Sequence, residues 1–226
     1  MALAESLVTL FSELPDHKTV VIIPQKGDKI DMKAVVFVDV QNDFVKGGKL
    51  PYGYPVEENT SKIIQFAKEC RTKGYALFAT ADTHKKETYL TKTLEGKNLP
   101  VEHCLEGTEG HKIVEGLVKD ENRNVIIPEG SIVDKPTFGS FELGYAIENY
   151  FSWIGEPLEE IILCGYDLGI CVLANAVMLR AKYPNLKIVV RTDLCGCVNE
   201  QTFKAAHGQM EQYARMRWMC SIRYPS

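Results

Sequence analysis

The sequence predicts an α/β fold: a doubly wound, Rossmann-like and mostly parallel sheet with helices on both faces. Three observations support this prediction. Strand-like runs alternate with helical patterns along the chain, which is the order that builds parallel sheets. The strand-like runs are apolar at nearly every position, as in strands that are buried on both faces. The chain has 226 residues, of which 45% are hydrophobic, so it can bury a substantial core.

Five runs rich in Val, Ile and Leu predict the strands, because short apolar runs bounded by polar or turn residues are typical of buried strands. In chain order they are AVVFVDV (34–40), YALFAT (75–80), NVIIP (124–128), EEIILCG (159–165) and LKIVVRT (186–192). The first helix is indicated by the helical spacing of Ile63, Ile64, Ala67 and Cys70. Further helices are expected over 139–153, from near residue 171 and over 199–214, followed by an apolar piece at 216–220.

The chain is expected to form one domain over residues 33–226, preceded by an extension over residues 1–32 that packs on the domain or on a neighbour. Its first 17 residues carry no positive n-region, so they do not resemble a secretory signal. The chain has seven cysteines, an odd number, which favours free thiols and a reducing compartment. We therefore expect a cytoplasmic protein.

Charge and hydropathy argue against two classes of partner. The formal net charge is −4, and Lys and Arg are scattered, so there is no basic stripe for a nucleic acid. Residues 161–179 are nearly free of charge, but Gly165, Asp167 and Gly169 interrupt them. This segment is expected to be a strand, a turn and a buried helix rather than a membrane span.

Reactive side chains follow four of the predicted strands. Asp39 ends the first, Asp82 and His84 follow the second, Lys135 follows the third, and Cys171 follows the fourth. Sites in open α/β sheets form at the carboxyl ends of the strands. The pattern therefore predicts a functional site at this edge of the sheet.

Cys171, taken alone, fits a buried thiol as well as a nucleophile. Its place at the start of a helix predicts a lowered thiol pKa, because unpaired N–H groups and the helix dipole stabilise a thiolate. Asp39 needs a cation such as Lys135 if it is buried as a carboxylate. Together the three residues supply a nucleophile, a proton carrier and a charge that keeps the carrier ionised. Separately, Asp39 fits a turn carboxylate and Lys135 a solvated surface lysine.

A possible metal site lies in the segment from 81 to 104. Asp82, His84, Glu95 and His103 are ligand types suited to Zn²⁺, Mn²⁺ or Fe²⁺. The alternative is that the histidines cap loops. Cys195 and Cys197, by contrast, supply too few ligands to form a zinc site on their own.

Five motifs occur in a fixed order along the chain: VFVDVQNDFVKGGKL, ATADTH, LPVEHCLEGTEG, DKPTFGSF and CGYDLGICVLANA. This ordered set resembles the nicotinamidase branch of the isochorismatase-like cysteine hydrolases, from about residue 33 to the C-terminus. The resemblance implies an isochorismatase-like domain with a catalytic triad of Asp39, Lys135 and Cys171. It also implies a metal ion, most simply zinc, held by Asp82, His84 and His103 with Glu95 as a further ligand.

The resemblance implies hydrolysis of the carboxamide of nicotinamide to nicotinate and ammonia through a Cys thioester, as in the salvage of NAD. The backbone N–H groups of Asp167 and Cys171 would stabilise the oxyanion, and the metal would orient the pyridine ring. The partner is then a small-molecule amide, and the family often forms homo-oligomers. Candidate walls of the ring pocket are Phe44, Leu99, Phe138 and Tyr166.

The chain departs from the family pattern at two places. Some members carry a third histidine in the metal loop, and HKKETYLTKTLE (84–95) has none. Family members often have Thr-Asp where this chain has Leu168 and Gly169. The family's cis peptide in this turn would fall at Tyr166–Asp167, and the carboxylate of Asp167 would oppose negative charge on an oxyanion beside it.

Three alternatives remain open. One is a related amidohydrolase for another small amide, which Asp167 favours. A second is a metal-free isochorismatase-type vinyl ether hydrolase, against which the ligand-rich loop with Asp82 and His84 counts. A third is a catalytically silent binding module that retains the fold.

Overall fold

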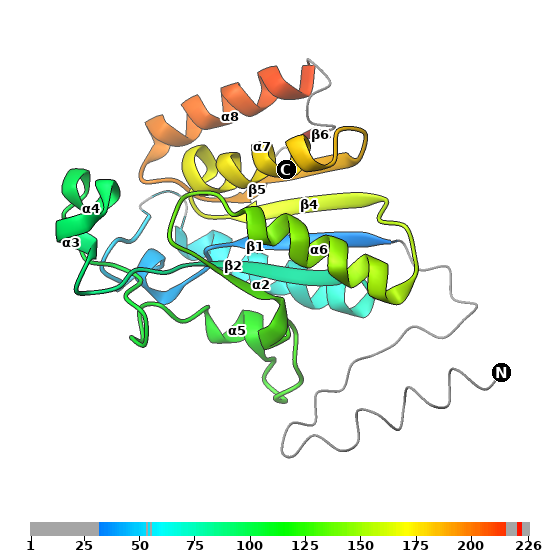
Figure 1. Cartoon of the computed structure of the whole chain (residues 1–226), viewed down its shortest axis with the longest axis horizontal. Coiled ribbons are helices and arrows are strands. Elements are labelled where there is room, and N and C mark those ends of the chain that lie inside the picture. The colour runs from blue at the N-terminus through cyan, green and yellow to red at the C-terminus, as the bar shows by residue number, and fades with distance from the viewer. Residues whose placement is uncertain (1–31, 53, 55, 216–220, 223–226) are drawn as a thin grey trace.

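The computed structural model describes residues 32–52, 54, 56–215 and 221–222. They contain a parallel sheet with strand order β3-β2-β1-β4-β5-β6, shown in Figure 1. The strands are β1 (Lys33–Val38), β2 (Ala76–Asp82), β3 (Ile132–Lys135), β4 (Glu160–Gly165), β5 (Lys187–Cys195) and β6 (Ser221–Ile222). Apart from Met32, the expected N-terminal extension lies outside the described residues, as does the apolar piece at 216–220.

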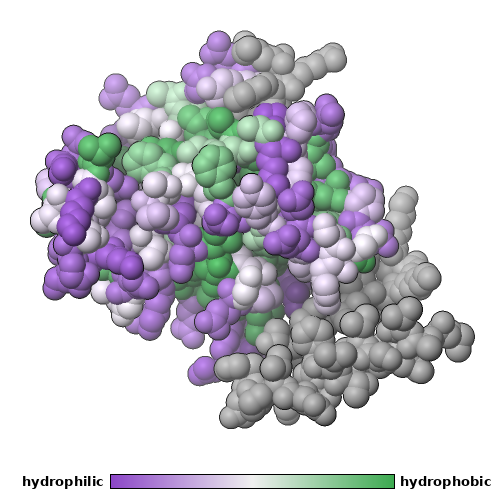
Figure 2. Space-filling model, in the orientation of Figure 1, coloured by the Kyte–Doolittle hydropathy of each residue, from purple (hydrophilic) through white to green (hydrophobic). Residues whose placement is uncertain are grey.

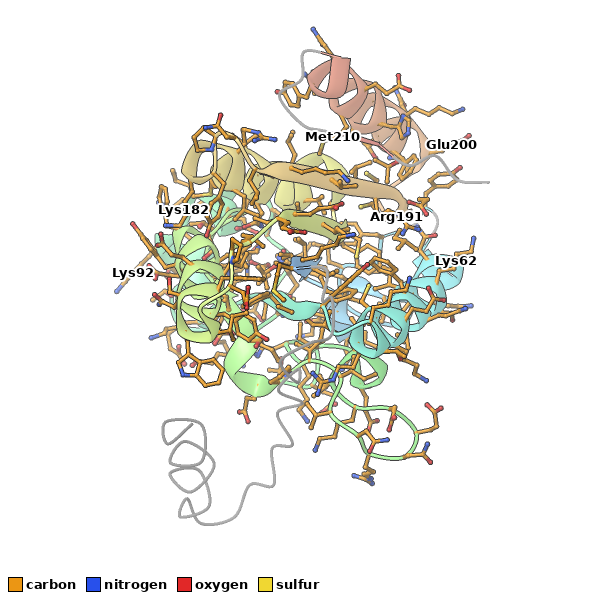
Figure 3. The ribbon with its side chains drawn as sticks, turned by 90° about the vertical axis from the view of Figure 1, so that its right-hand side faces the viewer. Lys62, Lys92, Lys182, Arg191, Glu200 and Met210 are labelled. Atoms are coloured by element: carbon orange, nitrogen blue, oxygen red, sulfur yellow. The ribbon has the colours of Figure 1, made fainter. Side chains whose placement is uncertain are left out.

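Helices cover both faces of this sheet, which confirms the predicted doubly wound α/β fold. Helix α2 lies on one face, and helices α6 and α7 lie on the other (Figure 3). The longer helices are α2 (Val56–Thr72), α6 (Phe141–Ile154), α7 (Leu173–Lys182) and α8 (Glu200–Arg215). The short ones are α3 (Tyr89–Lys92), α4 (Leu94–Asn98) and α5 (Glu115–Val118), with 3-10 turns at Asn42–Phe44 and Glu129–Ser131 and a π-helical turn at Leu168–Val172.

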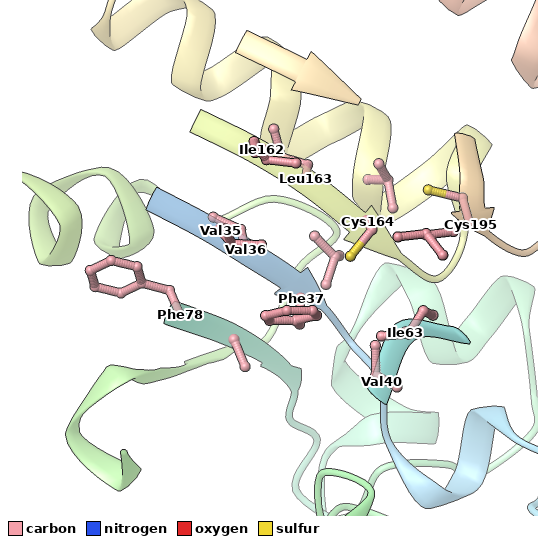
Figure 4. Close-up of a cluster of buried hydrophobic side chains, with 14 of the residues drawn as sticks. Val35, Val36, Phe37, Val40, Ile63, Phe78, Ile162, Leu163, Cys164 and Cys195 are labelled. Atoms are coloured by element: carbon pink, nitrogen blue, oxygen red, sulfur yellow. The ribbon is translucent and has the colours of Figure 1, made fainter. Parts of the chain in front are cut away.

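The core lies between the sheet and these helices (Figure 4). Phe37 of β1 and Leu163 of β4 are fully buried, and Ile63 of α2 packs in the same cluster. The central strands β1, β2 and β4 are buried at nearly every position. This burial explains why their sequences are continuously apolar rather than alternating.

The third strand was placed wrongly by the sequence prediction. The apolar run 124–128 does not pair in the sheet, and Val125 forms only an isolated bridge with Lys119. Ile126 and Ile127 are buried in the core nonetheless, so burial alone explains the apolar run. The strand that pairs with β2 is the short edge strand Ile132–Lys135.

The first strand ends two residues earlier than predicted, because the chain turns at Asp39. Asp39 has a φ of 51°, in the left-handed region that non-glycine residues seldom adopt. Three strands later in the sequence, Gly165 ends β4 with a φ of 121°, and a Cβ there would lie 2.2 Å from the Val38 carbonyl oxygen. Only glycine therefore allows β4 to lie this close to β1 directly before the turn that leads to Cys171.

The surface is hydrophilic over most of the face in Figure 2, with hydrophobic residues interspersed. The nearly charge-free segment 161–179 divides into β4, the π-helical turn and α7, as the sequence predicts. None of the helices within the described ranges is both long enough and apolar enough to span a membrane.

Candidate active site

Side chains from four strand ends meet at the carboxyl edge of the sheet. Asp39 follows β1, Asp82 ends β2, Lys135 ends β3 and Cys171 follows β4. All four are almost fully buried, with exposed fractions of 0, 3, 1 and 5%. The register that pairs Asp82 with Lys135 in the sheet sets these two side chains beside each other.

Lys135 lies at the centre of this group. Its Nζ is 2.7 Å from Asp39 Oδ2, 3.6 Å from Asp82 Oδ1 and 3.6 Å from Cys171 Sγ. It also donates a hydrogen bond to the Thr137 carbonyl at 3.1 Å. Burial disfavours its charged form, but Asp39 and Cys171 outweigh this effect and raise the pKa of Lys135 above its usual value. The lysine is therefore a fixed cation and not the solvated surface lysine of the alternative interpretation.

Asp39 is a buried carboxylate held by two neighbours. Its Oδ1 accepts a hydrogen bond of 2.7 Å from the Thr80 hydroxyl, and its Oδ2 faces Lys135. Burial raises the pKa of Asp39, while the Lys135 ammonium acts in the opposite direction. An ionised carboxylate whose basicity is raised in this way can accept a proton at neutral pH.

Cys171 lies in the π-helical turn Leu168–Val172 that precedes α7. Burial raises the pKa of the Cys171 thiol well above its usual value, Asp39 adds to the rise, and Lys135 opposes it. The expected lowering of this pKa by the helix N-terminus was wrong, because loss of solvent outweighs the helix end. The resting sulfur is a thiol, and it needs a base such as Asp39 to become a nucleophile.

The peptide bond between Tyr166 and Asp167 is cis, at the position implied by the family resemblance. The Asp167 carboxylate accepts hydrogen bonds from the N–H groups of Gly169 at 2.7 Å and Val198 at 3.3 Å, and from the Cys197 thiol at 3.2 Å. It therefore caps the turn rather than standing unpaired. Within the described part of the chain, no group accepts a hydrogen bond from the Asp167 N–H.

A second cluster adjoins the first through Asp82. Its Oδ2 lies 2.9 Å from His84 Nε2 and 3.2 Å from His103 Nε2, while Glu95 Oε1 lies 3.6 Å from each of these nitrogens. All four ligand atoms lie within 4.8 Å of one another. Ligands about 2.0 Å from a tetrahedral ion are separated by about 3.3 Å. The donor types and spacings therefore fit a single divalent ion such as zinc.

Groups around this cluster fix the ligand orientations. The Val101 carbonyl lies 2.7 Å from His103 Nδ1, an arrangement that leaves Nε2 free to bind a metal. Gln41 Oε1 accepts a hydrogen bond of 2.8 Å from the Asp82 N–H. Asp43 Oδ2 accepts one of 2.7 Å from the N–H of Cys104, the residue after His103. Sequence reasoning missed Gln41 and Asp43, although both belong to the quoted run VFVDVQNDFVKGGKL.

The predicted pocket residues differ in their placement. Phe44 is 2% exposed, and its ring centroid lies 5.5 Å from that of His103. Tyr166 is fully buried, and its hydroxyl lies 2.7 Å from the Thr60 hydroxyl. Leu99 is partly buried, whereas Phe138 is 46% exposed. Among these four predicted pocket residues, Phe44 is the one whose ring contacts a proposed metal ligand, His103, in the described structure.

Tyr52 joins this group of aromatic side chains, and sequence reasoning missed it. Its ring centroid lies 5.0 Å from that of Phe44 and 5.7 Å from that of Tyr166. Thr80 was also missed, although it is a hydroxyl residue in an otherwise apolar strand. A polar residue near the carboxyl end of a buried strand was the available signal.

Comparisons with known proteins show the family and the fold of this chain. Residues 33–222 match the family described as "Isochorismatase domain". A curated relative, the nicotinamidase of Escherichia coli strain K12, is 27% identical over 201 residues, which are 80% of this chain and 91% of that protein. The crystal structure of nicotinamidase PncA from Bacillus subtilis has a TM-score of 0.67 and 19% identity, over 85% of this chain and 99% of that one. The pyrazinamidase of Pyrococcus horikoshii in complex with zinc has a TM-score of 0.62 and 22% identity, over 86% and 99%.

Proposed function

The chain belongs to the isochorismatase family, and we propose that it acts as a nicotinamidase-type amide hydrolase, converting nicotinamide to nicotinate and ammonia. The observation that carries this proposal is the buried contact of Lys135 with both Asp39 and Cys171, directly beside four potential metal ligands. The curated nicotinamidase relative supports the substrate class. Nicotinate formed in this way would enter NAD salvage, in the cytoplasm.

Attack begins with Asp39. Its carboxylate takes the proton of the Cys171 thiol, and the sulfur forms a bond to the carboxamide carbon while an electron pair moves onto the oxygen. The N–H groups of Asp167 and Cys171 donate hydrogen bonds to that oxyanion. Lys135 keeps Asp39 ionised before the transfer, which its 2.7 Å contact allows.

The tetrahedral intermediate then collapses. The carbon–nitrogen bond breaks, and the nitrogen leaves as ammonia with the proton that Asp39 returns. A thioester remains on Cys171. Water attacks it while Asp39 again takes a proton, the carbon–sulfur bond breaks, and the proton returns to the sulfur, so that nicotinate is released and the thiol is restored.

Asp82, His84 and His103, with Glu95, would hold a divalent ion, for which zinc is the first candidate and Mn²⁺ or Fe²⁺ the others. When bound, such an ion would act as a Lewis acid toward the ring nitrogen, and so would orient the ring rather than activate water. Phe44 packs beside His103 and would form one wall of the ring pocket.

A second candidate function is hydrolysis of another small carboxamide. The observation that favours it is Asp167, a buried carboxylate in the turn next to the nucleophile. The metal-free vinyl ether hydrolase is disfavoured by the convergence of Asp82, His84, Glu95 and His103. We further propose that the enzyme forms a homo-oligomer, as members of this family often do.

Ammonia release from nicotinamide by the full chain tests the proposal. We expect turnover by the wild type and by Cys70→Ala, which replaces a buried thiol of α2, and none by Cys171→Ala. If nicotinamide is inert but pyrazinamide or another carboxamide releases ammonia, the second candidate is correct. Absence of ammonia from every carboxamide tried, with the protein folded and supplied with zinc, would refute amide hydrolysis.

A further inference from the structure

Tyr52 occupies a defined position between the two halves of the proposed site. Its backbone N–H donates a hydrogen bond of 3.2 Å to the Phe44 carbonyl, which folds the 42–52 loop back on itself. Its ring packs between Phe44, which contacts His103, and Tyr166, which precedes the turn to Cys171. The side chain thus lies between the metal-ligand cluster and the nucleophile.

The hydroxyl of Tyr52 makes no hydrogen bond with any residue that the structure describes, although the side chain is more than nine-tenths buried. Buried tyrosine hydroxyls usually find a partner. The neighbouring Tyr166 follows this rule, since its hydroxyl lies 2.7 Å from Thr60. Among the described residues, the fully buried side-chain atoms without a hydrogen-bond partner are Asp39 Oδ2 and Asp82 Oδ1. The Tyr52 hydroxyl is not among them, so it is open to solvent and can donate a hydrogen bond to a ligand atom.

The groups around Tyr52 determine the protonation state of its hydroxyl. Burial is the largest cause that raises the pKa of Tyr52 well above its usual value, and the nearby acidic groups, among them Asp167 and Asp39, add to the rise. The phenol therefore stays protonated at neutral pH and keeps its hydrogen available. The ring of Tyr52 lies 5.7 Å from that of Tyr166, which directly precedes the turn to Cys171.

We propose that the Tyr52 hydroxyl donates a hydrogen bond to the carbonyl oxygen of the amide substrate, as a third donor beside the N–H groups of Asp167 and Cys171. This inference rests on the proposed amide hydrolysis. A donor aimed at an oxygen that gains negative charge in the transition state raises kcat more than it lowers KM. A neutral phenol can fill this role beside two carboxylates without adding a further negative charge.

The test compares Tyr52→Phe with Tyr75→Phe. Tyr75 is a half-buried tyrosine that precedes β2 at the opposite end of the sheet. For Tyr52→Phe we expect kcat on nicotinamide to fall about 100-fold with KM changed less than about twofold. Because the lost hydroxyl has no protein partner, the melting temperature should not fall. A kcat within about threefold of wild type, or a change confined to KM, would overturn the proposal.

A binding measurement separates this inference from the proposed reaction. Pyridine-3-carbaldehyde can add the Cys171 thiol: a sulfur–carbon bond forms, and the thiol proton ends on the former carbonyl oxygen. Loss of one hydrogen bond to that oxygen should weaken the binding of the aldehyde about tenfold in Tyr52→Phe, and not in Tyr75→Phe. Equal affinity of wild type and Tyr52→Phe would refute the role of Tyr52. Inertness of the wild type toward nicotinamide would refute the reaction alone, since the aldehyde comparison would still decide the role of Tyr52.

Discussion

The ammonium of Lys135 lies 2.7 Å from a carboxylate oxygen of Asp39, and both side chains are almost entirely removed from solvent. A buried ion pair stabilises a protein little compared with an apolar pair, but removing one partner leaves an uncompensated charge. This pair therefore links the chemistry of the site to the stability of the fold, and both can be measured.

Replacement of the lysine should destabilise the protein and abolish turnover. We expect Lys135→Met to lower the free energy of unfolding by about 3–5 kcal/mol at neutral pH. Without the ammonium, the pKa of Asp39 rises further, so the folded state holds a proton that the unfolded chain loses above about pH 4. The deficit should therefore be small below pH 4 and grow as the pH rises.

Urea unfolding of wild type and Lys135→Met at several pH values measures this deficit. The double variant Asp39→Asn, Lys135→Met serves as the control, because it removes both charges. It should recover most of the stability and none of the activity. A deficit independent of pH, or no recovery in the double variant, would contradict the ion-pair explanation.

The raised pKa of Cys171 predicts an unusual pH profile for its reaction with iodoacetamide. Only the thiolate reacts, so the alkylation rate of Cys171 should still be rising above pH 9. In Asp39→Asn the profile should shift to lower pH, because the neighbouring negative charge that raises the pKa of Cys171 is gone. Mass spectrometry of the Cys171 peptide resolves it from the other cysteines; a rate that levels off below pH 8.5 in wild type would count against a raised pKa.

The same shift predicts how stability depends on pH. Because the pKa of Cys171 is higher in the folded state, the unfolded chain releases this proton first, from about pH 9. The stability of wild type relative to Cys171→Ala should fall as the pH rises above 9, by about 1.4 kcal/mol per unit until the folded-state pKa is reached. A difference that does not change between pH 7 and 10.5 would refute this prediction.

Binding of zinc to Asp82, His84 and His103 should stabilise the folded chain. At a free ion concentration about 100 times the dissociation constant, the expected gain is about 2.7 kcal/mol. A chelator should lower the melting temperature of wild type, and zinc should restore it. His84→Ala should lose both the metal and this response, while His207→Ala in α8 retains them.

Glu95→Gln supplies a graded comparison for the metal site. The Glu95 side chain is 14% exposed and lies 3.6 Å from both ligand nitrogens, farther than Asp82 lies from either nitrogen. We expect a smaller loss of metal affinity than in His84→Ala, as judged by metal content after dialysis. Equal metal content in wild type, His84→Ala and Glu95→Gln would exclude this cluster as the binding site.

Asp167 should contribute to both stability and rate, because it caps the turn that carries Cys171. We expect Asp167→Ala to lower the free energy of unfolding by about 1 kcal/mol and to lower kcat. Asp167→Asn keeps an oxygen that can accept from Gly169 N–H, so it should retain most of the stability. Thermal unfolding and steady-state kinetics measure both effects; an Ala variant as stable and as active as wild type would show that the cap is dispensable.

Sequence patterns were sufficient to predict the architecture of the fold and a site at the carboxyl edge of the sheet, where residues distant in sequence meet. Apolar runs separated by helices predicted the parallel sheet, and the rule of carboxyl ends brought Asp39 and Cys171 together. Lys135 was assigned to the end of the wrong run, 124–128, and it meets them because it is the last residue of β3. The third strand could not be placed in this way. Ile126 and Ile127 are as apolar as any strand residue, and hydrophobicity reports burial rather than pairing.

Two features of the site depend on three-dimensional surroundings that no local pattern contains. The pKa of Cys171 is governed by burial and by Asp39, which is distant in sequence. The position of Tyr52 depends on how the 42–52 loop folds back on Phe44. By contrast, the cis peptide at Tyr166–Asp167 was foreseen through the family resemblance.

Asp82 turns one carboxylate oxygen toward Lys135 and the other toward His84 and His103. Replacement of either histidine would therefore leave the contact between Asp82 and Lys135 in place. Replacement of Asp82 would remove a metal ligand and the carboxylate beside Lys135 at the same time. In relatives that have lost the metal, we therefore expect the two histidines to be substituted more often than the aspartate.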